Sequence, residues 1–432
     1  MKSSVAFKAC LIALLLFLPM CVEETDETKS VKLGIDLFVE RYLDLVEGKR
    51  VGLITNPTGV NGELETTIDL LLSSGVNLVA LYGPEHGVRG NAQAGEYVPF
   101  YWDDKYDLPV FSLYGQTMEV PGDILNNIDE YMKDFDTKHE GKLPEKKMVE
   151  GIDVMLFDIQ DVGTRVYTYI ATMAYAMRSC AELGIDFIVL DRPNPIGGAM
   201  EGPILEYPEY SSFVGLYPIP MRHGMTAGEL ATLFNDRFMD REVNLTVIRM
   251  EGWKRDVWYD DTGLPWVIPS PNMPTLDTAT VYPGQVLIEG TSMSEGRGTT
   301  KPFELFGAPW IDGYELAKEL NALELPGVKF REVWFTPTFS KYKNEMCGGV
   351  QIHVTDREKY KPFDTALYIL ETVRRLYPGK LTFDAHYFDR LAGNSWIRES
   401  LERGVPVQKI VDRYAEDLEN FRNVSEECML YD

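Results

Sequence analysis

The segment Val154-Met-Leu-Phe-Asp-Ile-Gln-Asp-Val-Gly163 joins an apolar run to a polar, glycine-containing loop, and a helical pattern follows over about residues 166–183. Residues 154–157 are apolar at successive positions, which is typical of a strand buried on both faces of a parallel sheet. Gly184 stands where it would end the helix. The segment therefore predicts strand, loop and helix, in the order that parallel α/β sheets repeat.

Other short apolar runs have the same character. They are Val51-Gly-Leu-Ile-Thr55, Leu78-Val-Ala-Leu-Tyr82, Val110-Phe-Ser-Leu-Tyr114 and Phe187-Ile-Val-Leu-Asp191, and a further strand is expected at residues 245–250. We therefore predict an α/β fold with a Rossmann-like, doubly wound and mostly parallel sheet. Each run ends in polar or Gly/Pro-rich residues. Because the carboxyl ends of parallel strands meet at one edge, these tails are expected to converge on one ligand site.

The chain of 432 residues is longer than one hydrophobic core usually supports, so two domains are expected. We assign residues 31–280 to a Rossmann-like catalytic domain and residues 281–432 to a second, smaller α/β domain. The smaller domain is expected to contain helices near 313–323, 363–376 and 405–421 and strands near 328–335 and 349–355. An acidic and lysine-rich stretch at about residues 129–150 predicts an exposed insertion.

The N-terminus predicts export. Lys2 and Lys8 precede an apolar run that ends at Met20 and is too short to span a bilayer, so residues 1–20 are interpreted as a signal peptide. Leu18-Pro-Met-Cys21 resembles a loose bacterial lipobox, in which the cysteine is lipidated. Residues 21–30 form a polar tether whose acidic stretch resembles the surface-export signal of some Gram-negative lipoproteins. We expect anchoring through Cys21 to the outer membrane, facing the periplasm or the cell surface. A plain secretory signal with a chance cysteine is the alternative.

Charge and cysteine content exclude several classes of function. The formal net charge is −25, and loss of Lys2 and Lys8 with the signal peptide makes it −27. Such a chain is not expected to bind nucleic acid, and an anionic substrate would need local arginines. The three cysteines after the lipobox are scattered, which argues against a disulfide framework or a zinc site and favours buried packing. They are Cys180, Cys347 and Cys428.

Several sequence motifs are missing. No GxGxxG follows the first strand, and no P-loop, HExxH or GxSxG motif occurs in the chain. A dinucleotide site, a P-loop nucleotide site, this class of zinc protease and a nucleophile elbow are therefore not expected. We expect neither a cofactor nor a metal.

What remains is a set of carboxylates at strand ends. Glu85 lies in Tyr82-Gly-Pro-Glu-His-Gly-Val-Arg-Gly90, where glycines and a proline predict a tight turn. His86 and Arg89 flank it at the expected crevice, so a functional role is favoured over that of a solvated loop residue. Glu96 is a second candidate on the same loop.

Asp158, Asp161 and Asp191 follow two later strands. Asp158 ends an apolar run, where a buried carboxylate requires either a charged or hydrogen-bonding partner or a functional role. A helix cap is the alternative for Asp161, and a salt-bridged strand end is the alternative for Asp191-Arg192-Pro-Asn194. Glu295 lies in the small-residue loop Glu289-Gly-Thr-Ser-Met-Ser-Glu-Gly-Arg-Gly-Thr-Thr300.

One carboxylate can be set aside, and the remaining ones favour a particular reaction. Thr226 and Glu229 have the spacing of a capping box, so Glu229 is interpreted as structural. Glycoside hydrolysis is the reaction that carboxylates alone can perform at neutral pH without metal or cofactor. Aromatic side chains near the crevice could stack on sugar rings, although core packing is their commoner use. They are Tyr167, Tyr169, Trp253, Trp266 and Trp310.

Six blocks of this sequence resemble those of the NamZ-type family, formerly a domain of unknown function and described as exo-β-N-acetylmuramidases. The blocks are Val51-Gly-Leu-Ile-Thr-Asn-Pro-Thr-Gly59, Gly83-Pro-Glu-His-Gly87, Phe157-Asp-Ile-Gln-Asp-Val-Gly-Thr-Arg-Val-Tyr-Thr-Tyr169, Leu190-Asp-Arg-Pro-Asn-Pro195, Pro269-Ser-Pro-Asn-Met-Pro274 and Ser294-Glu-Gly-Arg-Gly-Thr-Thr300. The resemblance covers essentially residues 31–432. It implies removal of terminal N-acetylmuramic acid from the non-reducing end of peptidoglycan fragments, in a cleft between the two domains.

The resemblance points to Glu85 as a catalytic residue. We rank its partner carboxylate in the order Asp158, Glu295 and Glu96. The residues expected to bind substrate are Asn56, His86, Arg89, Glu96, Gln160, Asp161, Arg165, Tyr167, Tyr169, Asp191, Arg192, Asn194, His223, Asn272 and Arg297.

N-acetylmuramic acid carries a lactyl carboxylate, which an acidic protein must nevertheless attract. A guanidinium pairs bidentately with such a group, so we expect at least one cleft arginine to confer preference for muramic acid over N-acetylglucosamine. The candidates are Arg89, Arg165, Arg192, Arg222 and Arg297.

Two other functions fit the same residues. A glycan-binding surface lipoprotein could capture muropeptides without cleaving them. An esterase or amidase could act on the same wall fragments, although the nucleophile elbow is missing.

Overall fold

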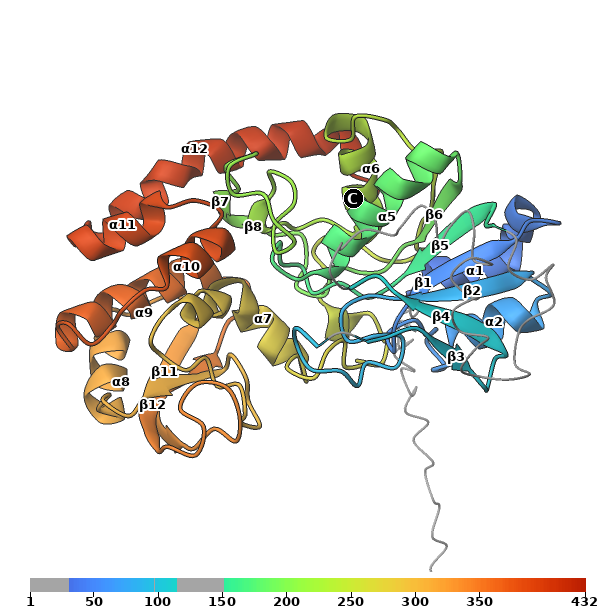
Figure 1. Ribbon diagram of the computed structural model, residues 1–432. Coiled ribbons are helices and arrows are strands. Elements are labelled where there is room, and N and C mark those ends of the chain that lie inside the picture. The colour runs from blue at the N-terminus through green and yellow to red at the C-terminus, as the bar shows by residue number, and fades with distance from the viewer. Residues whose placement is uncertain (1–30, 97, 115–150) are drawn as a thin grey trace, which may run out of the picture.

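The computed structural model describes residues 31–96, 98–114 and 151–432 (Figure 1). The expected signal peptide, Cys21, the tether and the insertion at residues 129–150 lie outside the described residues. No helix in the described ranges is long and apolar enough to cross a membrane.

The larger domain is built on a seven-stranded sheet with the order β3-β4-β2-β1-β5-β6-β9. Its strands are β1 (Val51–Thr55), β2 (Leu78–Gly83), β3 (Tyr101–Asp103), β4 (Leu108–Ser112), β5 (Val154–Asp158), β6 (Asp186–Leu190) and β9 (Leu245–Ile248). All neighbours pair in parallel except the edge strand β3, which is antiparallel to β4. Counted in chain order, the parallel strands read 3-2-1-4-5-6, the order of the Rossmann fold. The predicted doubly wound sheet is confirmed.

Helices cover both faces of this sheet, which explains why its strands are apolar at successive positions. Leu53 and Leu156 pack on one face with α1 and α2, whereas Ile54 and Phe157 pack on the other with α5 and α6. The helices of this domain are α1 (Gly34–Arg41), η1 (Leu43–Val46), α2 (Thr67–Ser73), α5 (Tyr169–Leu183), α6 (Ala227–Arg237) and η3 (Tyr259–Asp261). Helix α5 ends at Gly184, which has a left-handed conformation, as predicted.

The smaller domain contains a three-stranded sheet with the order β10-β12-β11, and both pairs are antiparallel. Its strands are β10 (Leu305–Ala308), β11 (Val328–Phe335) and β12 (Cys347–Val354). Its helices are α7 (Leu276–Gln285), η4 (Val286–Gly290), α8 (Gly313–Ala322), α9 (Pro362–Leu376), α10 (Ala385–Ala392), α11 (Trp396–Arg403), α12 (Val407–Ser425) and η5 (Glu426–Cys428). The expected strands and helices of this part are present. Helix α7 corrects one expectation, since residues 252–298 are rich in Trp, Pro and Gly and predict long ordered loops that cap the sheet.

A short antiparallel pair is inserted in the larger domain, between β6 and α6 in the chain. Strands β7 (Glu201–Ile204) and β8 (Pro220–Arg222) pair with each other, and the backbone N–H of Asp364 in α9 donates to Oε1 of Glu201 at 3.0 Å. Helix α12 then runs back over the molecule toward α6 (Figure 1). The chain therefore crosses between its two domains more than once.

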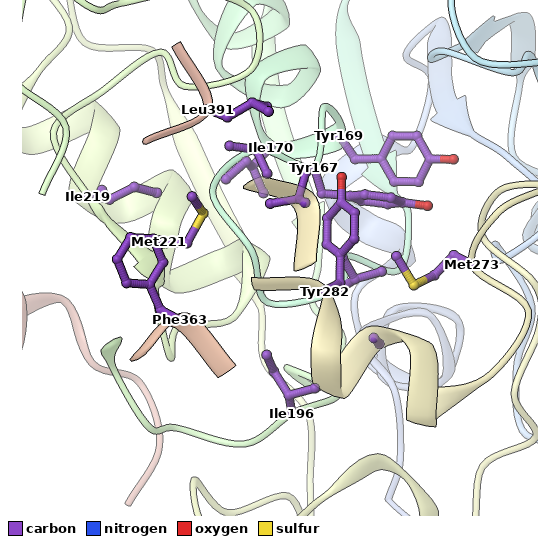
Figure 2. Packing of buried hydrophobic residues seen from close by; sticks show 14 of the residues in the cluster. Tyr167, Tyr169, Ile170, Ile196, Ile219, Met221, Met273, Tyr282, Phe363 and Leu391 are labelled. Carbon is purple, nitrogen blue, oxygen red and sulfur yellow. The ribbon is translucent and has the colours of Figure 1, made fainter. Parts of the chain in front are cut away.

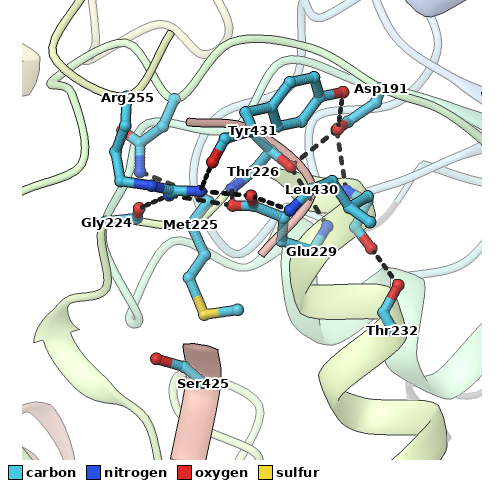
Figure 3. Close-up of polar contacts among 12 residues, drawn as sticks. Asp191, Gly224, Met225, Thr226, Glu229, Thr232, Arg255, Ser425, Leu430 and Tyr431 are labelled. Carbon is cyan, nitrogen blue, oxygen red and sulfur yellow. Dashed lines mark hydrogen bonds and ion pairs between the residues drawn. The ribbon is translucent and has the colours of Figure 1, made fainter. Parts of the chain in front are cut away.

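The C-terminal residues pack against the larger domain (Figure 3). The hydroxyl of Tyr431 donates to Oδ2 of Asp191 at 2.6 Å, and the backbone N–H of Leu430 donates to Oε1 of Glu229 at 2.8 Å. Thr226 and Glu229 form the predicted capping box at the start of α6. Arg255 binds the same Glu229 carboxylate at 2.6 Å. Glu229 is therefore structural, and it holds the end of the chain against α6.

Candidate active site

A cavity with a volume of about 870 Å³ has walls from both domains. The larger domain contributes the loops after β2, β4 and β5, the loop between β7 and β8, and the loop before α7. The smaller domain contributes α7, η4 and the loop that follows it, the loop between β11 and β12, and α10. The lining includes Glu85, His86, Tyr114, Tyr167, Thr168, Phe213, Asn272, Tyr282, Glu289, Arg297, Phe303, Phe339, Tyr387 and Arg390. Three of the contributing loops follow the carboxyl ends of parallel strands, where ligands bind in such folds.

Glu85 lies on this wall with its carboxylate oriented by hydrogen bonds. Oε1 accepts the backbone N–H of Gly95 at 2.9 Å, and Oε2 accepts the Thr168 hydroxyl at 2.9 Å. The Tyr114 hydroxyl also donates to Glu85, and burial together with the negative carboxylate raises the pKa of Tyr114 to about 12. Donors from three separate loops therefore hold this side chain facing the cavity.

The neighbouring His86 shapes the turn that carries Glu85. Its φ of 73° lies in the left-handed region, which is uncommon for a residue other than glycine. Its Nδ1 lies 2.8 Å from the carbonyl oxygen of Ala92, so Nδ1–H donates to that oxygen. This bond fixes the loop between the second strand and Gly95, where one of the donors to Glu85 lies.

A second carboxylate on the cavity wall, Glu289 in η4, was not predicted. Its Oε1 accepts the Arg297 Nη2–H at 2.7 Å, and its Oε2 accepts the Tyr387 hydroxyl at 2.6 Å. Burial acts to lower the pKa of Arg297, but the Glu289 carboxylate outweighs it and raises that pKa. Glu289 is the first residue of the block that contains Glu295, so the motif could have identified it. Because both of its oxygens are bound, Glu289 holds Arg297 and Tyr387 in the wall.

Glu295 lies behind this wall and does not line the cavity in the described part of the chain. It is only 2% exposed, and its carboxylate is 3.1 Å from Lys341 Nζ and 3.6 Å from Arg297 Nε. The Lys341 ammonium also donates to the carbonyl oxygens of Ile288, Glu289 and Met293. Glu295 therefore belongs to the buried charge network that supports Arg297.

Asp158, the first-ranked partner of Glu85, forms a buried ion pair instead. Asp158 is 0% exposed, and Arg192 contacts both of its oxygens, with Nε to Oδ1 at 2.5 Å and Nη2 to Oδ2 at 2.9 Å. The Thr67 hydroxyl donates to the same carboxylate. Neither Asp158 nor Arg192 is among the described residues that line the cavity. This geometry gives both residues a structural role between β5 and β6.

Other predicted site residues hold the strand-end loops to one another. Asp161 Oδ2 accepts the backbone N–H of Gly163 at 2.7 Å and lies 3.1 Å from His223 Nε2, so Asp161 stabilises a turn and caps no helix. Burial raises the pKa of Asp191 to about 6, and the residue binds the start of α6 and Tyr431. The remaining members of this group are buried and bonded within these loops: Asn56, Gln160, Tyr169 and Asn194. Glu96 is exposed and accepts the Gln93 backbone N–H.

The five arginines predicted to bind an anionic sugar are all engaged with protein groups. Arg165 is 1% exposed and donates to four backbone carbonyls. Arg89 pairs with Asp103, and Arg222 donates to the carbonyl oxygen of Ile196 beside a second cavity of about 300 Å³. Arg192 and Arg297 pair with carboxylates as described above. Of the five, only Arg297 lines the main cavity within the described residues.

Aromatic residues line the cavity, but most are not those expected. Tyr167 lies on the wall, and its ring meets the edge of the Tyr282 ring with centroids 5.9 Å apart. Figure 2 shows Tyr282 of α7 pointing toward Tyr167 and Tyr169, with Met273 beside them. The three predicted tryptophans pack on other tyrosines away from the lining. The aromatic wall therefore joins the two domains.

No group of three or more metal-binding side chains occurs within residues 31–96, 98–114 and 151–432. The cysteines Cys180, Cys347 and Cys428 are free and buried, in agreement with the packing role predicted for them.

We expect the Asp158→Asn variant to lose stability by about 3–5 kcal/mol, because it leaves the buried Arg192 guanidinium without its counter-charge. At a temperature at which the variant remains folded, hydrolysis of a glycoside substrate should stay within a few-fold of wild type. Thermal unfolding and initial rates measure the two effects. Full stability with lost activity would instead make Asp158 a catalytic residue.

Comparison with known proteins accounts for nearly the whole chain. The N-terminal domain model of exo-β-N-acetylmuramidase NamZ matches residues 51–139 and 135–277, and the C-terminal domain model matches residues 280–431. The peptidoglycan β-N-acetylmuramidase NamZ of Bacillus subtilis (strain 168) is 50% identical over 416 residues, which cover 96% of this chain and 94% of that protein.

Two crystal structures of DUF1343 family proteins from Bacteroides fragilis NCTC 9343 have the same fold. One has a TM-score of 0.81 at 40% identity, and the other has a TM-score of 0.71 at 31% identity. Each alignment covers 93% of this chain and 99% of the other. This chain belongs to the family of NamZ exo-β-N-acetylmuramidases, which are glycoside hydrolases.

Proposed function

We propose that this protein removes terminal N-acetylmuramic acid from the non-reducing end of peptidoglycan fragments. The observation that carries the proposal is the position of Glu85, a carboxylate that lines the shared cavity and is oriented by donors from three loops. The activity of the Bacillus subtilis relative, a peptidoglycan β-N-acetylmuramidase, supports the substrate class. The cavity volume lies within the range of small-molecule sites, which suits the end of a glycan chain.

Glu85 is the carboxyl group best placed to react with a bound sugar. Glycosidases use one carboxyl group to protonate the leaving oxygen, while a second group attacks the sugar or activates water. Glu289 shares the cavity, but Arg297 and Tyr387 occupy both of its oxygens. We therefore assign the direct chemistry on the glycosidic bond to Glu85 and a supporting role to Glu289. Phe213 and Phe339 line the cavity with partly exposed rings, and they provide apolar surface for a sugar ring.

The Glu85→Gln variant should lose about 10³-fold or more in turnover of a muramic acid–N-acetylglucosamine disaccharide, because the amide neither donates an acidic proton nor acts as a base. Binding of the disaccharide should survive. The exposed Glu63→Gln variant is the matched control and should retain wild-type rates. Initial rates and isothermal titration calorimetry measure the two properties.

Each alternative function predicts a different result in these assays. Binding without turnover in wild type would support a glycan-binding protein. Release of peptide or acyl groups in place of free sugar would support an amidase or esterase. Wild-type rates in Glu85→Gln would contradict the assignment of Glu85.

We also propose that the protein is exported and anchored to the outer membrane through lipidated Cys21. The support is the sequence of the first residues alone, in which Lys2, Lys8 and an apolar run precede Leu18-Pro-Met-Cys21.

The Cys21→Ala variant should move from the membrane fraction to the soluble fraction, because it lacks the thiol that carries the lipid. Cys10→Ala changes a cysteine inside the apolar run and should leave the protein in the membrane fraction. Fractionation and mass spectrometry of the mature N-terminus provide the measurement. Equal distribution of wild type and Cys21→Ala would contradict a lipid anchor.

A further inference from the structure

Among the described residues of the cavity wall, one cation has no partner. Within the described lining, the charged groups are Glu85, Glu289, Arg297 and Arg390, in addition to His86. Arg297 is neutralised by Glu289 at 2.7 Å. Arg390 is exposed and forms no hydrogen bond or ion pair with any described residue. Its guanidinium is therefore available to a ligand in the cavity.

The helix that carries Arg390 is held in place on several sides. Asp389 makes a two-point ion pair with Arg398, with N–O distances of 2.9 and 2.8 Å. Tyr387, one turn earlier, donates to Glu289 at 2.6 Å. Arg165 of the larger domain donates to the carbonyl oxygen of Leu391 at 2.9 Å. The backbone that presents Arg390 is thus fixed before a ligand binds, which reduces the ordering cost of binding.

We propose that Arg390 is a specificity residue that binds the lactyl carboxylate of the terminal muramic acid. This inference rests on the proposed function. It names the residue that recognises the lactyl group, which muramic acid carries and N-acetylglucosamine lacks. A guanidinium presents paired N–H donors that match a carboxylate, and such charge-assisted bonds are stronger than neutral ones. The protein carries a net charge of −25, so a local cation is needed to attract an anionic sugar.

The placement of the other arginines supports this assignment to Arg390. Arg165 and Arg192 are almost fully buried, and Arg89 pairs with Asp103. Arg297 shares the cavity but is held by Glu289 and lies 3.6 Å from Glu295. A carboxylate that approached Arg297 would compete with two protein carboxylates. Arg390 has no ion pair with a protein carboxylate among the described residues, so a ligand carboxylate would meet no such competition there.

The test compares three aryl β-glycosides: that of N-acetylmuramic acid, its lactyl methyl ester, and that of N-acetylglucosamine. Wild type should prefer the free acid over the methyl ester by about 10- to 100-fold in kcat/KM, the range of a hydrogen-bonded charge pair. Arg390→Gln should lower kcat/KM for the free acid by the same factor and leave kcat/KM for the methyl ester at the wild-type value. Arg390→Lys should retain part of the preference. The exposed Arg403→Gln in α11 is the matched control and should behave as wild type.

Failure of this inference differs from failure of the proposed function. If wild type hydrolyses the muramic acid glycoside and Arg390→Gln keeps the wild-type preference for the free acid, Arg390 does not read the carboxylate. Equal losses on acid and ester would likewise overturn the inference, because they indicate a general positioning effect. If wild type cleaves none of the three glycosides but cleaves another bond, the proposed function itself is wrong.

Discussion

A buried guanidinium joins the two domains and sets the shape of the cavity. Arg165 follows β5 and donates to the carbonyl oxygens of Pro203, Ile219, Leu391 and Ala392 at 2.9–3.0 Å. Burial lowers its pKa to about 9, so the group stays charged at neutral pH, and carbonyl dipoles offset the loss of water. Gly393 ends α10 with a φ of 78°, and a Cβ there would lie 2.8 Å from Arg165 Nη2. Glycine at this position lets the end of α10 approach the guanidinium.

This link explains how one cavity combines residues that are far apart in the chain. The loop after β5 carries Thr168, which orients Glu85, and α10 carries Tyr387 and Arg390. Arg165 fixes these two segments relative to each other. The carboxylates on the wall then differ in their surroundings: Glu85 is held by neutral donors, whereas Glu289 is neutralised by Arg297. A chain with a large negative charge can thus place in one cavity both a carboxylate held by neutral donors and, among the described residues, an unpaired arginine.

The sequence was sufficient to predict the sheet and the part of the site that the strand-end loops of the larger domain form. Apolar runs predict buried parallel strands, and their carboxyl ends place Glu85 at a crevice. Pairing between side chains cannot be predicted in this way, because the partners come from distant segments. Asp158 and Arg192 end neighbouring strands, and only the fold brings Thr67 to the same carboxylate. Arg390 was missed because α10 lies outside the recognised sequence blocks, and α7 was missed because it contains Pro283.

The central claim is that the cavity built around Glu85 is where the glycosidic bond is broken. A crystal structure of the Glu85→Gln variant with a muramic acid–N-acetylglucosamine disaccharide tests this claim most directly. We predict that the muramic acid ring lies in the cavity, with the glycosidic oxygen within hydrogen-bond distance of the residue 85 amide and the lactyl carboxylate against Arg390. A disaccharide bound in the smaller cavity beside Arg222, or bound with its glycosidic oxygen out of reach of residue 85, would contradict the claim.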